Sequence, residues 1–330
     1  MNLEHGGNIF AISRQMSWDW REVLDFSASI NPLGPSPCVI DAIRRSLDRI
    51  AHYPEREPRA LVEALAYKWN VQPEQILLGN GATELIHFFA RTNSFERVTL
   101  VVPVFSEFHR AYPRAVCVPI DSNWPREGLA VLTQPLNPTG CLIDLEDYLL
   151  HTNHPVLIDE SFLDFTGEPS IARRLNERPK LYVLRSLTKF YALPGLRVGA
   201  LLGSSAAIAQ LRCIREPWQV NGLAEQAALA ALADTAHSER TLAYVAGERA
   251  WLTGQLAILD GVHPQASSAN YLLVVLDYPA SPLIRHLLER KILIRDCSSW
   301  PGIEFPNAVR VAVRKREDNE RLIEAWKELP

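Results

Sequence analysis

The residues best suited to covalent chemistry lie in the segment 183–203. Lys189 follows an apolar run that is typical of a buried strand, and two hydroxyl residues, Ser186 and Thr188, precede it closely. Arg197 follows a few positions later. A lysine amine can bond covalently to an aldehyde, and hydroxyl and guanidinium groups bind phosphate. The segment therefore favours a phosphorylated aldehyde as the cofactor.

Four other predicted strand ends carry groups that the same cofactor can use. The turn at 79–83 is glycine-rich and opens a helix, so its free N–H groups suit a phosphate. Phe105 offers a flat face for stacking, Asn137 an amide, and Asp159 a carboxylate for a ring nitrogen. Each feature alone has an ordinary structural interpretation: a surface lysine, a helix-capping aspartate or a plain strand-to-helix turn. Their combination favours one site.

The elements that must position these groups follow from hydrophobic periodicity. Strands alternating with helical connections predict a mostly parallel sheet, with functional groups at the carboxyl ends of its strands. Strands are predicted at 76–78, 98–104, 130–134, 155–160, 181–184 and 198–202, and helices at 38–50, 61–69, from 83, and from 223 to about 259. A small α+β module follows, with strands at 271–277, 292–297 and 309–313 and helices at 281–291 and 319–329.

Composition narrows the class of protein. The 330 residues are 47% hydrophobic and 22% charged, which is ordinary for a globular enzyme. A formal charge of −4 and the absence of a basic stripe argue against a nucleic-acid partner. The five cysteines form no C-x-x-C pair, so we expect no disulfide framework, no metal site and a cytoplasmic location. The N-terminus does not read as a signal peptide, and no apolar run approaches 18 residues, so we expect no membrane partner.

The order of the motifs G-N-G-A-T-E, P-x-F, N-P-T-G, D-E-S-F, S-L-T-K and G-L-R resembles fold-type-I pyridoxal-phosphate enzymes of the aminotransferase superfamily. Within it, the chain resembles histidinol-phosphate aminotransferases and, more closely, the L-threonine-O-3-phosphate decarboxylases of cobalamin biosynthesis, through segments such as HGGN, DFSASINPLG, EPWQVN and ILIRDCSSWPG. The likeness runs from residue 5 to about residue 326. It implies an α/β fold with a seven-stranded-type sheet between helices and a small α+β domain. The expected division is an N-terminal arm packing with the small domain (1–45), a large cofactor-binding domain (46–235) and the small domain (236–330).

The resemblance also implies a role for each matching residue. Lys189 and Asp159 are the expected catalytic residues: Lys189 forms a Schiff base with pyridoxal 5'-phosphate, and Asp159 pairs with its ring nitrogen. Asn137 is expected at the phenolic oxygen and Phe105 on the ring face. The other expected cofactor-binding residues, around the phosphate, are Gly81, Ala82, Thr83, Ser186, Thr188, Arg197 and, from the neighbouring subunit of a homodimer, Tyr53. The expected substrate-binding residues are His5, Asn31, Asn137, Arg295 and Arg310, with Arg310 on the carboxylate and His5 and Arg295 near a phosphate.

Two features depart from the broader superfamily. Phe162 stands where aminotransferases of this type usually carry a tyrosine, so one hydrogen bond to the phenolic oxygen is missing. This substitution also resembles the decarboxylase subgroup. The segment between Phe105 and Asn137 is shorter than usual, which predicts a trimmed helix and strand at the sheet edge.

The predicted site residues are compatible with three functions. Reaction choice depends on which bond at Cα stands perpendicular to the cofactor ring, so it is a matter of orientation. If Arg310 holds the carboxylate perpendicular, CO2 leaves, and the product from L-threonine O-3-phosphate is (R)-1-amino-2-propanol O-2-phosphate. If it holds the carboxylate in the plane, Lys189 can move the Cα proton, which gives an aminotransferase acting on a compound such as histidinol phosphate. The third hypothesis is a non-catalytic binding protein of the same fold.

Overall fold

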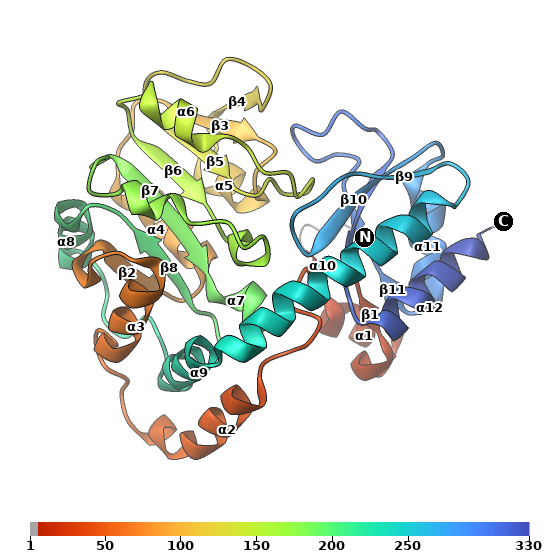
Figure 1. Ribbon diagram of the computed structural model, residues 1–330, viewed down its shortest axis with the longest axis horizontal. Helices are drawn as coiled ribbons and strands as arrows, with labels where there is room; N and C mark the ends of the chain where they lie inside the picture. Colours follow the sequence, from red (N-terminus) through yellow and green to blue (C-terminus); the bar gives the residue numbers. More distant parts are fainter. Residues whose placement is uncertain (1–5, 330) are drawn as a thin grey trace.

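The computed structural model describes residues 6–329, and a seven-stranded sheet forms the centre of its larger part, on the left in Figure 1. The strand order is β2-β8-β7-β6-β5-β3-β4. Strand β8 runs antiparallel to both of its neighbours, and every other adjacent pair is parallel. The prediction of an α/β fold with a mostly parallel sheet is therefore confirmed. The strands are β2 (Ile76–Gly79), β3 (Val98–Val102), β4 (Val116–Pro119), β5 (Leu129–Thr133), β6 (Val156–Asp159), β7 (Leu181–Ser186) and β8 (Gly199–Leu202).

Helices cover both faces of this sheet, because its inner strands are apolar on both sides. Successive strand residues point to opposite faces; Leu100 and Val102 belong to one core, and Val101 to the other. The first core contains α4, α5 and α8, and the second contains α3, α6 and α9. The helices of this unit are α2 (Pro37–Arg45), α3 (Arg59–Trp69), α4 (Ala82–Thr92), α5 (Ser106–Ala111), α6 (Leu145–Leu150), α7 (Leu187–Phe190), α8 (Ser205–Cys213) and α9 (Gly222–Ala233), with 3-10 turns η2 (Leu47–Ala51), η3 (Pro73–Gln75), η4 (Leu163–Phe165) and η5 (Ile171–Arg174).

The C-terminal part forms a second, smaller sheet with its own apolar core. Its strand order is β12-β13-β10-β9, antiparallel throughout. The long helix α10 (Thr235–Ala257) runs from α9 to this sheet, as Figure 1 shows. The elements are β9 (Val262–Pro264), β10 (Tyr271–Leu276), β12 (Arg295–Asp296), β13 (Ala308–Ala312), α11 (Ala280–Glu289) and α12 (Arg316–Lys327).

The N-terminal arm contacts both units. It contains α1 (Ile9–Met16), η1 (Trp20–Glu22) and β1 (Leu24–Asp25), and β1 pairs in parallel with β11 (Ile292–Leu293) of the small unit. The expected arm, residues 1–45, also includes α2. This helix packs on α9 and buries Val39 in the core of the large unit.

Several predicted elements have different bounds. The helix predicted from 223 to about 259 is broken at Asp234, whose side chain accepts the backbone N–H of His237 at 3.0 Å and so caps α10. The strand predicted at 292–297 is two short strands, β11 and β12, in different sheets. The helix predicted at 38–50 ends at Arg45 and continues as η2. At the sheet edge, α5 and β4 are both present as short elements, so the shorter segment there removes neither of them.

Candidate active site

A cleft opens at the carboxyl ends of the parallel strands, where the large unit meets the small one. It encloses roughly 930 Å³ of empty space, the solvent at its mouth included, which is room for a small-molecule ligand. Its lining comes from segments far apart in the sequence: Gly6, Ser27, Ala28, Ser29, Ala82, Thr83, Ile86, Phe105, Ser106, Thr133, Asn137, Asp159, Ser161, Phe162, Ser186, Thr188, Lys189, Arg197, Arg295, Trp300 and Arg310.

One end of the cleft has the features of a phosphate cradle. Helix α4 begins after Gly81, whose φ of +81° suits glycine, and no side chain within residues 6–329 caps its first N–H groups. A Cβ on Gly81 would lie 2.3 Å from Arg197 Nη2. Opposite, the hydroxyls of Ser186 and Thr188 are 2.7 Å apart. Open N–H groups, two hydroxyls and a guanidinium suit a phosphate dianion.

Lys189 lies in α7, one turn after β7 ends. Burial lowers the pKa of its amine to about 8, and the positive charges of Arg310 and Arg197 add to this effect, while Asp159 opposes it. Its Nζ lies 5.9 Å from the centre of the Phe162 ring. A lysine with this pKa is about one-tenth neutral at pH 7 and about half neutral at pH 8, far more than an ordinary lysine, and the neutral amine is the form that attacks an aldehyde.

Asp159 ends β6 and is only 4% exposed. One carboxylate oxygen accepts the N–H of Ser161 at 2.9 Å and also its hydroxyl. Burial raises the pKa of this carboxyl to about 6, although the hydrogen bonds from Ser161 act in the other direction. A cation placed beside the carboxylate would restore its ionised form, and a protonated ring nitrogen is such a cation.

Arg310 on β13 joins the small unit to the large one. Its Nη1 donates to Asn137 Oδ1 at 2.7 Å, and its Nη2 donates to the carbonyl oxygen of Ser27 at 2.8 Å. The guanidinium also lies 5.1 Å from the centre of the Tyr271 ring, and the Tyr271 hydroxyl donates to a backbone carbonyl. The structure thus brings together Asn137 and Arg310, as predicted, and Arg295 lies beside Arg310 on the neighbouring strand.

Three predicted site residues within residues 6–329 do not line the cleft: Gly81, Asn31 and Tyr53. Gly81 lies directly before the lining residues Ala82 and Thr83, at the start of α4. Asn31 is buried beneath it, where its amide donates to the Phe190 carbonyl and to Thr241 Oγ1. Its backbone N–H binds the carbonyl of Lys189, so it supports the lysine segment and does not reach the cleft. Tyr53 is 82% exposed and stacks on another surface aromatic ring. His5 lies outside the described residues.

The sequence missed several residues of the site. Ser161 follows Asp159 by two positions, and this short spacing was the available signal. Tyr271 and Trp300 lie in segments that the resemblance covers, but their roles depend on contacts between the two units. Ser27 lies in the N-terminal arm, far from Arg310 in the sequence, and only the folded structure brings its carbonyl to Arg310.

A buried charge cluster lies behind Asp159 and ties β6 to β7. Arg185, next to Ser186 in the sequence, donates to Glu160 at 2.8 Å and to Asp164 at 2.6 Å. These side chains are buried or nearly so, and breaking such a cluster by removing one partner is strongly destabilising. The cluster therefore fixes the relative position of the two strand ends that carry Asp159 and Ser186.

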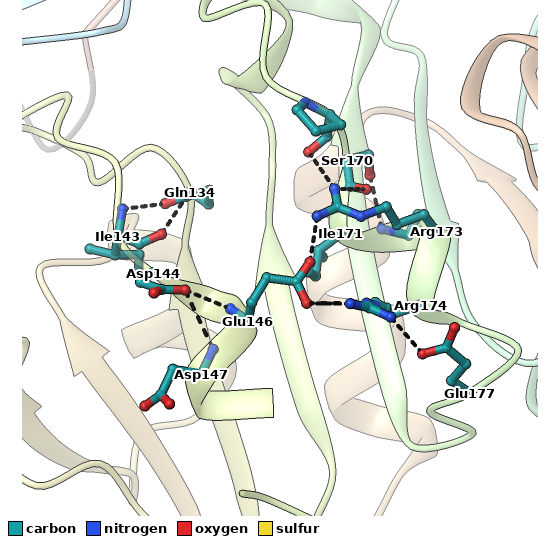
Figure 2. A network of polar contacts seen from close by, with 12 residues as sticks. Gln134, Ile143, Asp144, Glu146, Asp147, Ser170, Ile171, Arg173, Arg174 and Glu177 are labelled. Atoms are coloured by element: carbon teal, nitrogen blue, oxygen red, sulfur yellow. Dashed lines mark hydrogen bonds and ion pairs between the residues drawn. The ribbon is translucent and has the colours of Figure 1, made fainter. Parts of the chain in front are cut away.

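The η5 segment is held from both sides by polar contacts. Figure 2 shows the outer side, where the Glu146 carboxylate lies between Arg173 and Arg174. On the inner side, Glu160 accepts the first backbone N–H of η5 at 2.8 Å. Glu160 therefore links the surface network to the strand end that positions Asp159.

The polar groups of the cleft fit pyridoxal phosphate. Thr133 Oγ1, Ser29 Oγ and Arg310 Nε are buried and have no hydrogen-bond partner within residues 6–329. Buried polar atoms are normally hydrogen-bonded, so these atoms indicate a polar ligand. The phosphate cradle and Asp159 match the two charged ends of the cofactor. In the described part of the chain, no group of three or more histidine, cysteine, aspartate or glutamate residues could hold a metal ion.

Comparison with known proteins agrees with this class of site. Residues 118–325 match the family model described as aminotransferase class I and II. The threonine-phosphate decarboxylase of Salmonella typhimurium is 36% identical, over 98% of this chain and 96% of its own. The histidinol-phosphate aminotransferase of Symbiobacterium thermophilum is 32% identical, over 93% of this chain and 90% of its own. The crystal structure of L-threonine-O-3-phosphate decarboxylase from Porphyromonas gingivalis has a TM-score of 0.83 at 25% identity, covering 92% of this chain and 98% of that one.

The fold and the site thus define an enzyme that depends on pyridoxal phosphate. The chain belongs to the aminotransferase class I and II family. None of the helices within residues 6–329 is both long enough and apolar enough to cross a membrane.

Proposed function

We propose that this enzyme decarboxylates L-threonine O-3-phosphate to (R)-1-amino-2-propanol O-2-phosphate, a reaction of cobalamin biosynthesis. The observation that carries the proposal is the pair of arginines, Arg310 and Arg295, which face each other on adjacent strands and both line the cleft. A substrate with both a carboxylate and a phosphate presents one anionic group to each. The similarity to the Salmonella enzyme over nearly the whole chain supports the same substrate.

The roles of the residues follow from their positions. Lys189 would hold the cofactor through its amine, and the Asp159 carboxylate would keep the ring nitrogen protonated. Arg310, already fixed by Asn137 and Ser27, receives the substrate carboxylate on the N–H groups that its protein partners leave open. When bound, pyridoxal phosphate supplies the electron sink for the charge left on Cα.

Phe162 supports decarboxylation as well. It is buried beside Lys189 and packs edge-on against the Tyr271 ring at 5.0 Å. A phenylalanine offers no hydroxyl to the phenolic oxygen of the cofactor, so Asn137 would be the side chain that contacts that oxygen. In this respect the chain resembles the decarboxylases and differs from most aminotransferases of this fold.

The second candidate function is amino transfer from a phosphorylated amino compound such as histidinol phosphate. Two observations favour it: the 32% identity to a histidinol-phosphate aminotransferase, and the pKa of Lys189 near 8, which suits a residue that moves the Cα proton. Histidinol phosphate has no carboxylate, so in this case Arg310 would serve the 2-oxo acid acceptor.

One assay separates the two functions. The purified enzyme with added pyridoxal phosphate is given L-threonine O-3-phosphate without any 2-oxo acid, and CO2 release is measured. In parallel, it is given histidinol phosphate with 2-oxoglutarate, and glutamate is measured. We expect CO2 release in the first reaction and at most a trace of glutamate in the second. Glutamate formation without CO2 release would establish the aminotransferase.

We also propose a homodimer in which Tyr53 reaches the phosphate cradle of the partner subunit. Tyr53 is exposed, it stacks on Trp218 at 4.8 Å, and neighbouring Ile50 is 74% exposed, so this surface is apolar. Variants Tyr53→Ala and Lys189→Ala are expected to be weak and inactive, respectively. When the two variants are refolded together, mixed dimers should regain activity. In a mixed dimer, one of the two sites has both the native Lys189 and the native Tyr53. No recovery would exclude a shared site.

A further inference from the structure

The loop that follows β12 crosses from the small unit to the large one beside the cleft. Its residue Trp300 donates its indole N–H to the carbonyl oxygen of Val104 at 3.0 Å. Two residues later, Gly302 adopts a φ of +83° and packs against Val102. A Cβ on Gly302 would lie 2.8 Å from the backbone of Val102. The loop thus binds the segment between β3 and Phe105, the residue expected to stack on the cofactor ring.

The same tryptophan forms part of the cleft wall. The Arg295 guanidinium lies 5.5 Å from the centre of its ring, within the range of a cation–π contact. Burial lowers the pKa of Arg295, and the charge of Arg310 adds to this effect. Two arginines near each other repel, so the electron-rich face of Trp300 helps to keep Arg295 in the cleft.

We propose that Trp300 is a specificity-determining positioning residue: its ring holds Arg295 in place for the phosphate of the substrate, and its N–H fixes the loop to the strand end that carries Phe105. The inference rests on the proposed function only in requiring a phosphorylated substrate, and both candidate substrates carry a phosphate. Trp300 acts through Arg295 and makes no bond to the reacting atoms.

The test compares two substitutions of Trp300 in the enzyme with bound pyridoxal phosphate. Trp300→Phe keeps an aromatic face and loses the N–H, whereas Trp300→Leu keeps a smaller apolar side chain and loses both the N–H and the aromatic face. The readouts are KM and kcat with L-threonine O-3-phosphate and the inhibition constant of inorganic phosphate. Trp300→Leu is expected to raise KM and the inhibition constant about 10-fold, the size of a partly desolvated cation–π contact, with kcat within about threefold of the wild type. Trp300→Phe is expected to change each by about threefold at most.

A double-mutant cycle with Arg295→Gln identifies the route of the effect. If Trp300 acts through Arg295, Trp300→Leu adds less than about twofold in the Arg295→Gln background, because the interaction is already gone. An equal loss in both backgrounds would overturn the proposal, as would a loss of cofactor absorbance in Trp300→Leu. If L-threonine O-3-phosphate is not turned over, histidinol phosphate replaces it, and the inorganic phosphate series tests Trp300 regardless of the reaction.

Discussion

Replacing Asp159 with asparagine is expected to stabilise the cofactor-free protein and to inactivate the loaded enzyme. Burial raises the pKa of this carboxyl from 3.8 to about 6. The folded protein therefore binds this proton more tightly than the unfolded chain does. The stabilising contribution of the protonated group is complete below pH 3.8 and is lost as the pH rises through about 6. At pH 8 the ionised carboxylate costs about 3 kcal/mol of folding free energy.

Asparagine has nearly the same shape and no charge. Its side-chain oxygen can still accept both hydrogen bonds from Ser161. We expect the cofactor-free Asp159→Asn variant to melt roughly 5 °C above the wild type at pH 8. The gain in free energy should fall to about half at pH 5, because less of the wild-type cost remains there. Thermal melts at matched protein concentrations measure both values.

With pyridoxal phosphate present, the Asp159→Asn substitution is expected to be harmful: cofactor affinity and turnover should both fall. Removing one partner of a buried ion pair costs about 3–5 kcal/mol, or roughly 100-fold to several-thousand-fold in cofactor affinity and turnover. Ser161→Ala is the matched control: it removes one hydrogen bond and keeps the charge, so we expect a loss of about tenfold. A cofactor-free Asp159→Asn variant no more stable than the wild type at pH 8 would refute this reasoning, and so would unchanged cofactor affinity.

Three further variants test other parts of the site. Lys189→Ala should abolish turnover and the visible absorbance of the bound cofactor. In the wild-type enzyme, the rate of cofactor uptake should rise about fivefold from pH 7 to pH 8 and level off at higher pH. The reason is that the neutral amine reacts and the pKa of Lys189 is about 8. Arg310→Lys should lower kcat/KM by about 100-fold or more with cofactor retained, since lysine cannot span both protein partners, whereas Arg314→Lys, outside the cleft, should stay within about threefold. Gly81→Ala should weaken cofactor binding measured by equilibrium dialysis, because its φ is +81° and a Cβ would collide with Arg197; wild-type affinity in that variant would show that the cradle is misplaced.

The sequence predicted the parts of the site that depend on local rules. Apolar runs ending in polar residues located the ends of β6 and β7, so Asp159 and Lys189 could be expected at one edge of the sheet. The glycine-rich turn before α4 was likewise predicted from spacing. These features are short-range, and the parallel sheet aligns them automatically.

The remaining features depend on packing between distant segments. Asn31 matched a substrate position, yet its amide is saturated by Phe190 and Thr241, which lie far away in the sequence. Ser27 also depends on packing between distant segments. It binds Arg310 through its backbone carbonyl, and because every residue has such a carbonyl, the residue type could not predict this contact. The break at Asp234 was obscured by the alanine-rich sequence before it, where helix propensity is high, and by the helical sequence that follows it.

The charge distribution of the cleft connects stability to ligand binding. Lys189, Arg197, Arg295 and Arg310 line one cavity, and among these lining residues only Asp159 carries the opposite charge. Burial and mutual repulsion lower the pKa values of Lys189 and Arg295, so the protein without ligand holds these cations at a cost. An anionic cofactor would remove part of that cost, and so would the phosphorylated substrate of the proposed function, since each would bring negative charge to these cations. The residues that weaken the ligand-free fold are therefore also the residues expected to favour doubly charged, phosphorylated ligands.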